Sequence, residues 1–141
     1  TPAPDWPTMA LRLAEANADV FPLFETADWE RYARQLCRER DGEVVFDYDP
    51  DLVHVFDDFD PETFRGDLWQ VYAALRRTPV MAVRGALSDL VTAATVEAMR
   101  RCHPVFDSCV VPDQGHAPVL WERSVLDRIA AFLDAGTVPS P

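Results

Sequence analysis

VMAVRGALSDLVTAATVEAMRRCHPVFDSCVVPDQGHAP, residues 80–118, is the stretch that decides the fold. Residues 80–83 form a continuous apolar run that an Arg-Gly pair stops, which is typical of a strand buried on both faces of a parallel sheet. A helix is expected over 92–101, and the apolar run 105–111, ended by a proline, is expected to form the next strand. Two strands joined by a helix predict parallel pairing with a right-handed crossover.

The pattern continues to the end of the chain. A last helix is expected over 121–133, with Gly136 just beyond its end. Residues 78–141 therefore read as strand, helix, strand, helix, the order of an α/β fold. Two parallel strands alone would leave backbone groups unpaired along an open edge, so we expect the sheet to continue into a part of the fold that this chain does not contain.

The preceding segment, residues 1–77, is predicted to be mostly helical. Helices are expected over 7–21, over 26–37 and over 67–75, with a short strand at 44–46. In the second helix Thr26 is the expected cap, and the helical spacing from Trp29 to Cys37 predicts an aromatic and apolar face. An acidic stretch, residues 47–61, separates the strand from the third helix.

Composition and charge exclude several classes of function. The chain has 141 residues, 48% of them hydrophobic and 26% charged, as expected for one soluble globular domain. Its net charge of -11 repels phosphate backbones and anionic membranes, so neither nucleic acid nor membrane is an expected partner. All 13 basic residues are Arg, which excludes Schiff-base, pyridoxal-phosphate and P-loop chemistry that needs a lysine from these residues.

The cysteines and acidic residues do not predict a metal or an organic cofactor. Cys37, Cys102 and Cys109 are an odd number without metal-ligand spacing, which favours a reducing compartment such as the cytoplasm, and Cys109 is expected to be the most surely buried. The acidic run 47–60 could suggest calcium, but it lacks the spacing and the glycine of an EF-hand loop, so a solvated face is the favoured interpretation. A chain that begins with Thr1 instead of Met suggests a processed product or a fragment.

Two residues that could carry chemistry follow the two predicted strands. Asp89 lies a few residues past the first strand and His116 lies in the equivalent loop after the second. Because neighbouring strands are about 4.8 Å apart, the two side chains can meet at the carboxyl edge of the sheet. A carboxylate bonded to one ring nitrogen would orient the imidazole while the other nitrogen takes a proton from a nucleophile. Taken singly, Asp89 could be a helix cap and His116 an exposed turn residue.

The run 78–133 resembles the C-terminal end of an α/β-hydrolase, through the strings RGALSDLV and GHAPVL after its two strands. In that family the catalytic triad runs nucleophile, acid, histidine along the chain. The resemblance implies that Asp89 is the triad acid and His116 the triad histidine. Residues 1–77 are similar to the cap or lid that such enzymes insert before these last strands.

The chain departs from this family at the nucleophile. None of its serines lies in a G-x-S-x-G context; they are Ser88, Ser108, Ser124 and Ser140. The nucleophile and the oxyanion-hole segment are therefore expected on an N-terminal half that is absent here, and the chain alone should not catalyse. An Asp nucleophile, as in the dehalogenase and epoxide-hydrolase branches, is a weaker possibility.

The favoured hypothesis is thus part of a hydrolase that acts on an ester or related bond of a small apolar substrate, without a cofactor. Trp69 is the residue proposed to contact substrate under the lid, although an aromatic residue at helical spacing is more often part of the core. His54 and His103 are expected to be structural. The competing hypothesis is a non-catalytic interaction domain that binds a partner, or a second copy of itself, through an exposed sheet edge.

Overall fold

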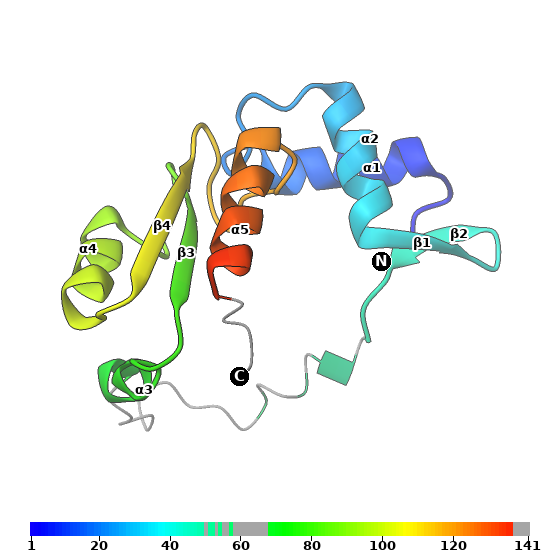
Figure 1. Ribbon diagram of the computed structural model, residues 1–141. Helices are drawn as coiled ribbons and strands as arrows, with labels where there is room; N and C mark the ends of the chain where they lie inside the picture. The colour runs from blue at the N-terminus through cyan, green and yellow to red at the C-terminus, as the bar shows by residue number, and fades with distance from the viewer. Residues whose placement is uncertain (50, 53, 55–56, 58–67, 137–141) are drawn as a thin grey trace. The chain divides into compact units, whose positions relative to one another are not determined.

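The computed structural model describes residues 1–49, 51–52, 54, 57 and 68–136 (Figure 1). The chain divides into two compact units. The first unit consists of Thr1–Asp19 and Leu23–Gly66, and the second unit consists of Val20–Pro22 and Asp67–Pro141. A role for residues 1–77 as a cap stays a prediction.

The first unit contains two helices followed by a β-hairpin. Its elements are α1 (Trp6–Asn17), α2 (Thr26–Leu36), β1 (Cys37–Arg40) and β2 (Glu43–Phe46). The two strands pair antiparallel around Asp41 and Gly42, which both have positive φ angles, of 54° and 82°. Backbone hydrogen bonds of 2.8 and 2.7 Å between Ala3 and Val44 attach the N-terminal segment to β2.

Side-chain hydrogen bonds set the ends of both helices. The side chain of Asp5 accepts from the Thr8 amide at 2.8 Å and caps the start of α1. The helix ends at Asn17, earlier than the predicted residue 21, and the Asn17 side chain bonds the Leu13 carbonyl at 2.9 Å. The prediction that Thr26 caps α2 was wrong, because Glu25 occupies the cap position and forms a capping box with the third helical residue.

The prediction that Cys37 continues the α2 helix was also wrong. Cys37 is buried as the first residue of β1, where it pairs with Phe46, and the Leu36 carbonyl already accepts from the Asp47 amide at 2.9 Å. Pairing within the hairpin therefore overrides the helical spacing at this point. The buried apolar residues of the first unit are Ala3, Met9, Ala10, Leu13, Trp29, Ala33, Cys37 and Val44.

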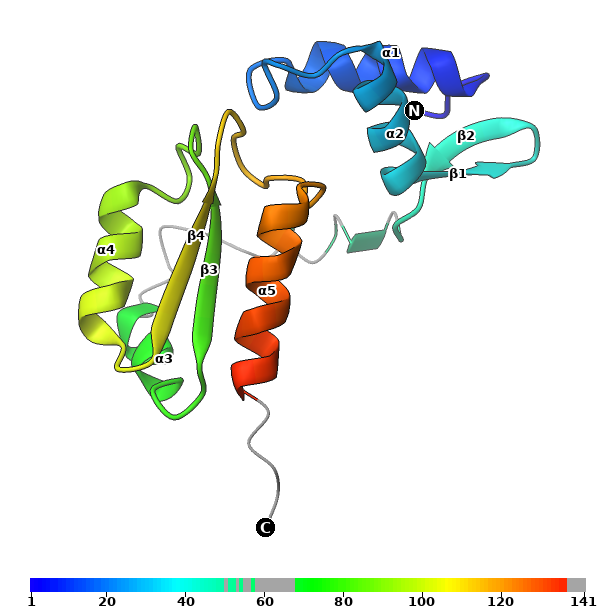
Figure 2. The same cartoon turned by 45° about the horizontal axis from the view of Figure 1, so that its top comes forward.

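The second unit confirms the predicted order of strands and helices. It contains α3 (Leu68–Ala74), β3 (Val80–Gly85), α4 (Ala93–Cys102), β4 (Phe106–Val111) and α5 (Arg123–Gly136). β3 and β4 pair in parallel, in register from Val80 opposite Phe106 to Gly85 opposite Val111. Figure 2 shows α4 and α5 on opposite sides of this strand pair, as Figure 1 does. The helices thus cover both faces, as parallel strands require.

Three details of the second unit differ from the predictions. β3 includes the Arg84-Gly85 pair that was expected to stop it, and Gly136 is the last residue of α5 instead of the first one beyond it. Cys109 is only half-buried in β4, whereas Cys37 is the buried cysteine. The expected start of α3 at Asp67 lies outside the described residues, as do Asp58 and Asp60 of the acidic run.

The second unit leaves apolar side chains of β4 and α5 exposed. In the part of the chain that the structure describes, β3 and β4 pair only with each other. Val110, within β4, has 55% of its surface exposed, and Leu133 on α5 has 60%. Within the same residues, no helix combines the length and the hydrophobicity needed to cross a membrane.

Candidate functional site

Asp89 and His116 lie in the two loops that follow the parallel strands. The loop after β3, residues 86–92, contains Asp89, and the loop after β4, residues 112–122, contains His116. Both loops therefore leave the carboxyl edge of the strand pair, where open parallel sheets place ligands and catalytic groups. Both side chains are exposed.

A backbone hydrogen bond joins the two loops directly. The Ala86 amide donates to the carbonyl of Val111, the last residue of β4, at 2.8 Å, and the Leu87 amide donates to the Gln114 carbonyl at 2.9 Å. The first bond extends the pairing of the strands by one residue, and the second connects the Asp89 loop to the His116 loop. The Asp89 loop and the His116 loop are consequently fixed to each other through main-chain atoms.

Gly85 permits this close approach. A methyl group built at Gly85 would overlap the carbonyl oxygens of Gln114 and Gly115, which belong to the His116 loop. Backbone atoms cannot move aside as the end of a flexible side chain can, so any other residue at position 85 would push the two loops apart.

The Asp89 loop is held from inside by Arg84 and Ser88. The half-buried Arg84 guanidinium donates from Nε to the Val91 carbonyl at 2.6 Å and from Nη2 to the Ala86 carbonyl at 3.0 Å, with a longer contact of 3.4 Å to the Ser88 carbonyl. Ser88 is buried, and its hydroxyl accepts from the Val91 amide at 3.0 Å. The loop therefore presents Asp89 from a fixed backbone, and Ser88 has a structural role there.

The His116 loop is anchored at its start and its end. The Gly115 amide donates to the Val20 carbonyl at 2.7 Å, and a methyl group at Gly115 would lie 3.1 Å from the Val20 Cγ1 atom. At the other end the side chain of Gln114 bonds the Val119 amide and the Glu122 carboxylate, both at 2.8 Å. His116 lies between these anchors.

The structure brings the two loops together but forms no direct contact between the two predicted catalytic side chains. Among the described residues, no hydrogen bond or ion pair joins Asp89 to His116. Their pairing as acid and base stays a prediction.

Trp69 lies on α3, apart from these loops. It lines an open cavity of about 340 Å³ together with Leu68, Tyr72, Thr95 and Met99, and none of these residues belongs to the Asp89 or His116 loop. The side chain of Trp69 is 44% exposed. Its role in binding substrate stays a prediction.

His103 is a buried histidine whose two ring nitrogens are both used. Nδ1 accepts from the Val105 amide at 3.2 Å, so Nε2 carries the proton and donates to the Leu75 carbonyl at 3.1 Å. The ring therefore holds α3 near the start of β4, which is the structural role expected for it. His54 bonds Asp57 at 2.7 Å on the surface.

An ion pair fixes α5 against β4. Arg128 Nη2 lies 2.6 Å from Asp107 Oδ1, and the same carboxylate accepts from the Ser108 amide at 2.8 Å. Burial raises the pKa of Asp107, but the hydrogen bonds from Arg128 and Ser108 and the charges of Arg128 and Arg100 outweigh it, so the pKa lies below its ordinary value.

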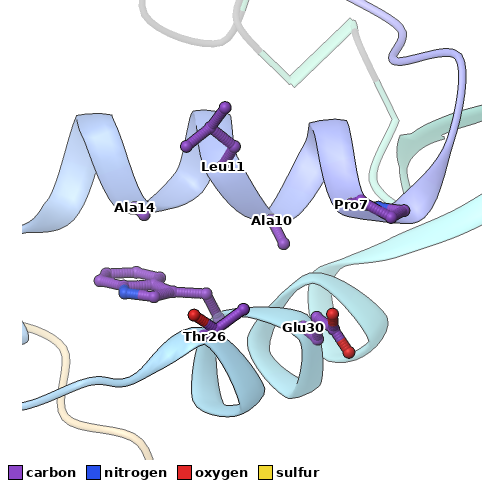
Figure 3. A pocket seen from close by; sticks show the side chains of 7 residues that line it. Pro7, Ala10, Leu11, Ala14, Thr26 and Glu30 are labelled. Carbon is purple, nitrogen blue, oxygen red and sulfur yellow. The ribbon is translucent and has the colours of Figure 1, made fainter.

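The first unit has a pocket of its own between α1 and α2, with a volume of about 150 Å³. In Figure 3, Ala10 and Ala14 of α1 face the start of α2, where Thr26 and Glu30 supply the polar atoms of the lining. The lining is otherwise apolar, and the pocket contains no histidine or cysteine.

The described residues contain no group of three or more His, Cys, Asp or Glu that could hold a metal ion. Part of the acidic run 47–60 lies outside these residues.

Sequence reasoning missed Arg84 and Gln114. Arg84 is the next-to-last residue of β3 and Gln114 lies in the loop after β4, but nothing in their local pattern shows that their side chains bond the loop backbone. The signal that the sequence offers is that each of these polar residues directly precedes a glycine.

Comparisons with known proteins support the fold. The chain is similar to the crystal structure of an alpha/beta hydrolase from Novosphingobium aromaticivorans, with a TM-score of 0.81 and 30% identity over 95% of this chain and 47% of that one. It is also similar to an esterase from Mycobacterium tuberculosis, with a TM-score of 0.57, 26% identity and coverage of 94% and 44%. No family model matches.

A curated relative is similar in sequence over part of the chain. A 3-hydroxybutyrate-oligomer hydrolase from Cupriavidus necator is 40% identical over 74 residues, which are 50% of this chain and 25% of that protein. The chain thus spans less than half the length of each of these proteins.

Proposed function

Because the chain has the α/β-hydrolase fold over about half of a solved hydrolase's length, we propose that it supplies the catalytic acid and histidine of a hydrolase whose nucleophile lies outside these residues. The single observation that carries the proposal is the joining of the Asp89 and His116 loops at the carboxyl edge of β3 and β4. The two residues also follow each other in the order that the fold requires.

In this proposal His116 is the general base. Its imidazole takes the proton from a serine hydroxyl as the serine attacks a carbonyl carbon, and returns that proton to the leaving group. Asp89 accepts a hydrogen bond from the other ring nitrogen, which fixes the tautomer and stabilises the imidazolium. Since both side chains are exposed in this structure, the hydrogen bond between them would form when the rest of the site covers them.

The substrate class proposed is an ester or related bond of a small, largely apolar molecule. The Mycobacterium tuberculosis protein is an esterase, and the Cupriavidus necator protein hydrolyses 3-hydroxybutyrate oligomers, whose units are joined by ester bonds. The net charge of -11 disfavours a strongly anionic substrate.

The exposed apolar surface of the second unit supports the view that another part of the fold covers it. Val110 is more than half exposed although it lies in a strand, and the exposed Leu87 and Leu90 flank the Asp89 loop. Without its covering part, the chain should associate with itself or with a partner through these surfaces.

Labelling with a fluorophosphonate, which marks activated serines, tests the proposal. Intact-mass spectrometry should find no adduct on the 141-residue chain and one adduct, on a serine upstream of Thr1, in the full-length product of its gene. The His116→Ala variant of that product should lose the adduct. An adduct on one of the serines of this chain, or equal labelling of the His116→Ala variant, would contradict the proposed division of the catalytic groups.

A full-length product that hydrolyses esters without being labelled would point to an Asp nucleophile instead. That result would contradict the attack by a serine. The roles of His116 and Asp89 would then be tested by the effect of their substitution on activity.

A further inference from the structure

Gln114 is a buried polar residue. It lies outside the strands and is neither the proposed acid nor the proposed base. Only 6% of its surface is exposed. Its Oε1 atom accepts from the Val119 amide and its Nε2 atom donates to Glu122 Oε1, both at 2.8 Å. Both polar atoms of the carboxamide are therefore hydrogen-bonded. The bond to the Val119 amide closes a loop of the chain that contains His116.

The main chain of Gln114 contacts the other loop. Its carbonyl oxygen accepts from the Leu87 amide at 2.9 Å, and this oxygen and its carbon lie where a side chain at Gly85 would have to go. The main chain of Gln114 thus bonds the Asp89 loop, and the side chain of Gln114 bonds the His116 loop.

Glu122 connects this arrangement to the last helix. The Glu122 carbonyl accepts from the Val125 and Leu126 amides, both at 3.1 Å, at the start of α5. Its Oε2 atom is buried and has no hydrogen-bond partner among the described residues, so the bond from Gln114 is what holds the carboxylate. Glu122 as a whole is half-buried, but with one oxygen buried and without a partner, the remaining hydrogen bond to its side chain is costly to lose.

We propose that Gln114 is a positioning residue for His116, fixing the backbone of the His116 loop against both the Asp89 loop and the first turn of α5. This inference rests on the proposed function and deepens it. Gln114 does not touch the reacting atoms, so its loss should lower the rate of the chemical step and leave substrate binding nearly unchanged, because a small misplacement of a catalytic base costs rate steeply.

A reciprocal exchange of the two side chains tests this inference. Gln114→Glu alone places two carboxylates together, and Gln114→Met removes both hydrogen bonds at similar volume. The double variant Gln114→Glu/Glu122→Gln restores them, since the introduced carboxylate accepts from the Val119 amide and the introduced carboxamide donates to it. Gln70→Met, on the exposed surface of α3, is the matched control.

Two readouts separate the structural part from the catalytic part. Amide hydrogen exchange of Val119 and Leu87 in the 141-residue chain should accelerate about tenfold or more in Gln114→Met relative to Gln70→Met. In the full-length gene product, kcat for a short ester should fall about tenfold or more in Gln114→Met and Gln114→Glu, with KM within about threefold. The double variant should recover most of kcat.

An unchanged kcat in Gln114→Met, or a double variant no better than Gln114→Glu, would overturn the inference while the proposed function stands. A variant that unfolds is recognised by the loss of slow amide exchange throughout the second unit. In that case the kcat of the double variant decides: recovery of kcat supports the inference, and no recovery contradicts it. A full-length wild-type product without hydrolase activity would instead remove the proposed function, and the positioning role with it.

Discussion

The backbone amide of Leu87 lies 2.9 Å from the backbone carbonyl oxygen of Gln114, two residues before Asp89 and two residues before His116. This hydrogen bond places the two loops in register beyond the end of the sheet. The separation of the proposed acid and base is therefore set by main-chain pairing, and side-chain rotamers only complete it.

Substitution of the proposed acid and base should abolish turnover in the full-length gene product. His116→Ala should remove nearly all activity, and Asp89→Asn should lower kcat by about 10³-fold or more, because the amide stabilises the wrong imidazole tautomer. The matched control is Asp113→Asn, an exposed residue of the same edge whose φ of 54° asparagine also adopts. Steady-state kinetics on an ester substrate check this, and a loss below about tenfold for Asp89→Asn would mean that Asp89 is only a loop residue.

Gly85→Ala should be far more destabilising than Gly115→Ala. The added methyl group at position 85 would overlap two carbonyl oxygens, whereas at position 115 it would lie 3.1 Å from the Val20 Cγ1 atom and 3.3 Å from the Val20 Cα atom, which requires a shift of only a few tenths of an ångström. The expected losses in the free energy of unfolding are about 3 kcal/mol and about 1 kcal/mol, respectively. Urea unfolding followed by circular dichroism measures both, and equal losses would contradict the close approach at Gly85.

Arg84→Met should loosen the Asp89 loop. The variant keeps the apolar stem but loses the hydrogen bonds to the carbonyls of Val91 and Ala86, at a cost of about 2 kcal/mol. Arg101→Met is the control, since Arg101 makes only an exposed ion pair with Glu97, worth less than about 0.5 kcal/mol. Chemical denaturation compares the two variants, and the idea fails if they are equally stable.

The Asp107–Arg128 pair should make stability depend on pH in the acidic range. The pKa of Asp107 is lowered in the folded chain from 3.8, so its stabilisation is fully present above that value and is lost as the pH falls through the lower, folded pKa. The Arg128 side chain is 53% exposed and the Asp107 side chain 32%, which screens the pair and limits its contribution to less than about 1 kcal/mol.

Unfolding of the wild type and of Arg128→Met at pH 6 and at pH 3 measures this effect. At pH 6 the wild type should have a larger free energy of unfolding than Arg128→Met. At pH 3 this difference between the two proteins should be smaller. A difference that is constant or larger at pH 3 would show that Arg128 stabilises α5 by packing alone.

The sequence predicted those parts of the fold that local patterns specify. The apolar runs that became β3 and β4 have no helical spacing, and the helix expected over 92–101 is α4. Its cap is Thr92, so the alternative role of Asp89 as a helix cap was wrong. The strand β1 was missed because its sequence, CRER, follows a helical stripe without interruption, and only its pairing with β2 makes it a strand.

The sequence predicted where Asp89 and His116 lie, because each follows a strand and strand ends are defined by local sequence. Their catalytic roles stay a prediction, and the contacts that hold their loops could not be predicted. The inward turn of the Arg84 and Gln114 side chains depends on which carbonyls and amides the folded loops leave unpaired. That information exists only in the folded backbone.

The hydrogen bond from Gly115 to the Val20 carbonyl shows that the second unit is closed by three residues from the first quarter of the chain. A shortened protein that starts at residue 67 would lack this acceptor and would expose the flank of the glycine against which Val20 packs. Any natural or engineered replacement of the first unit would therefore have to leave a main-chain carbonyl in the place of the Val20 carbonyl, because the second unit includes this acceptor.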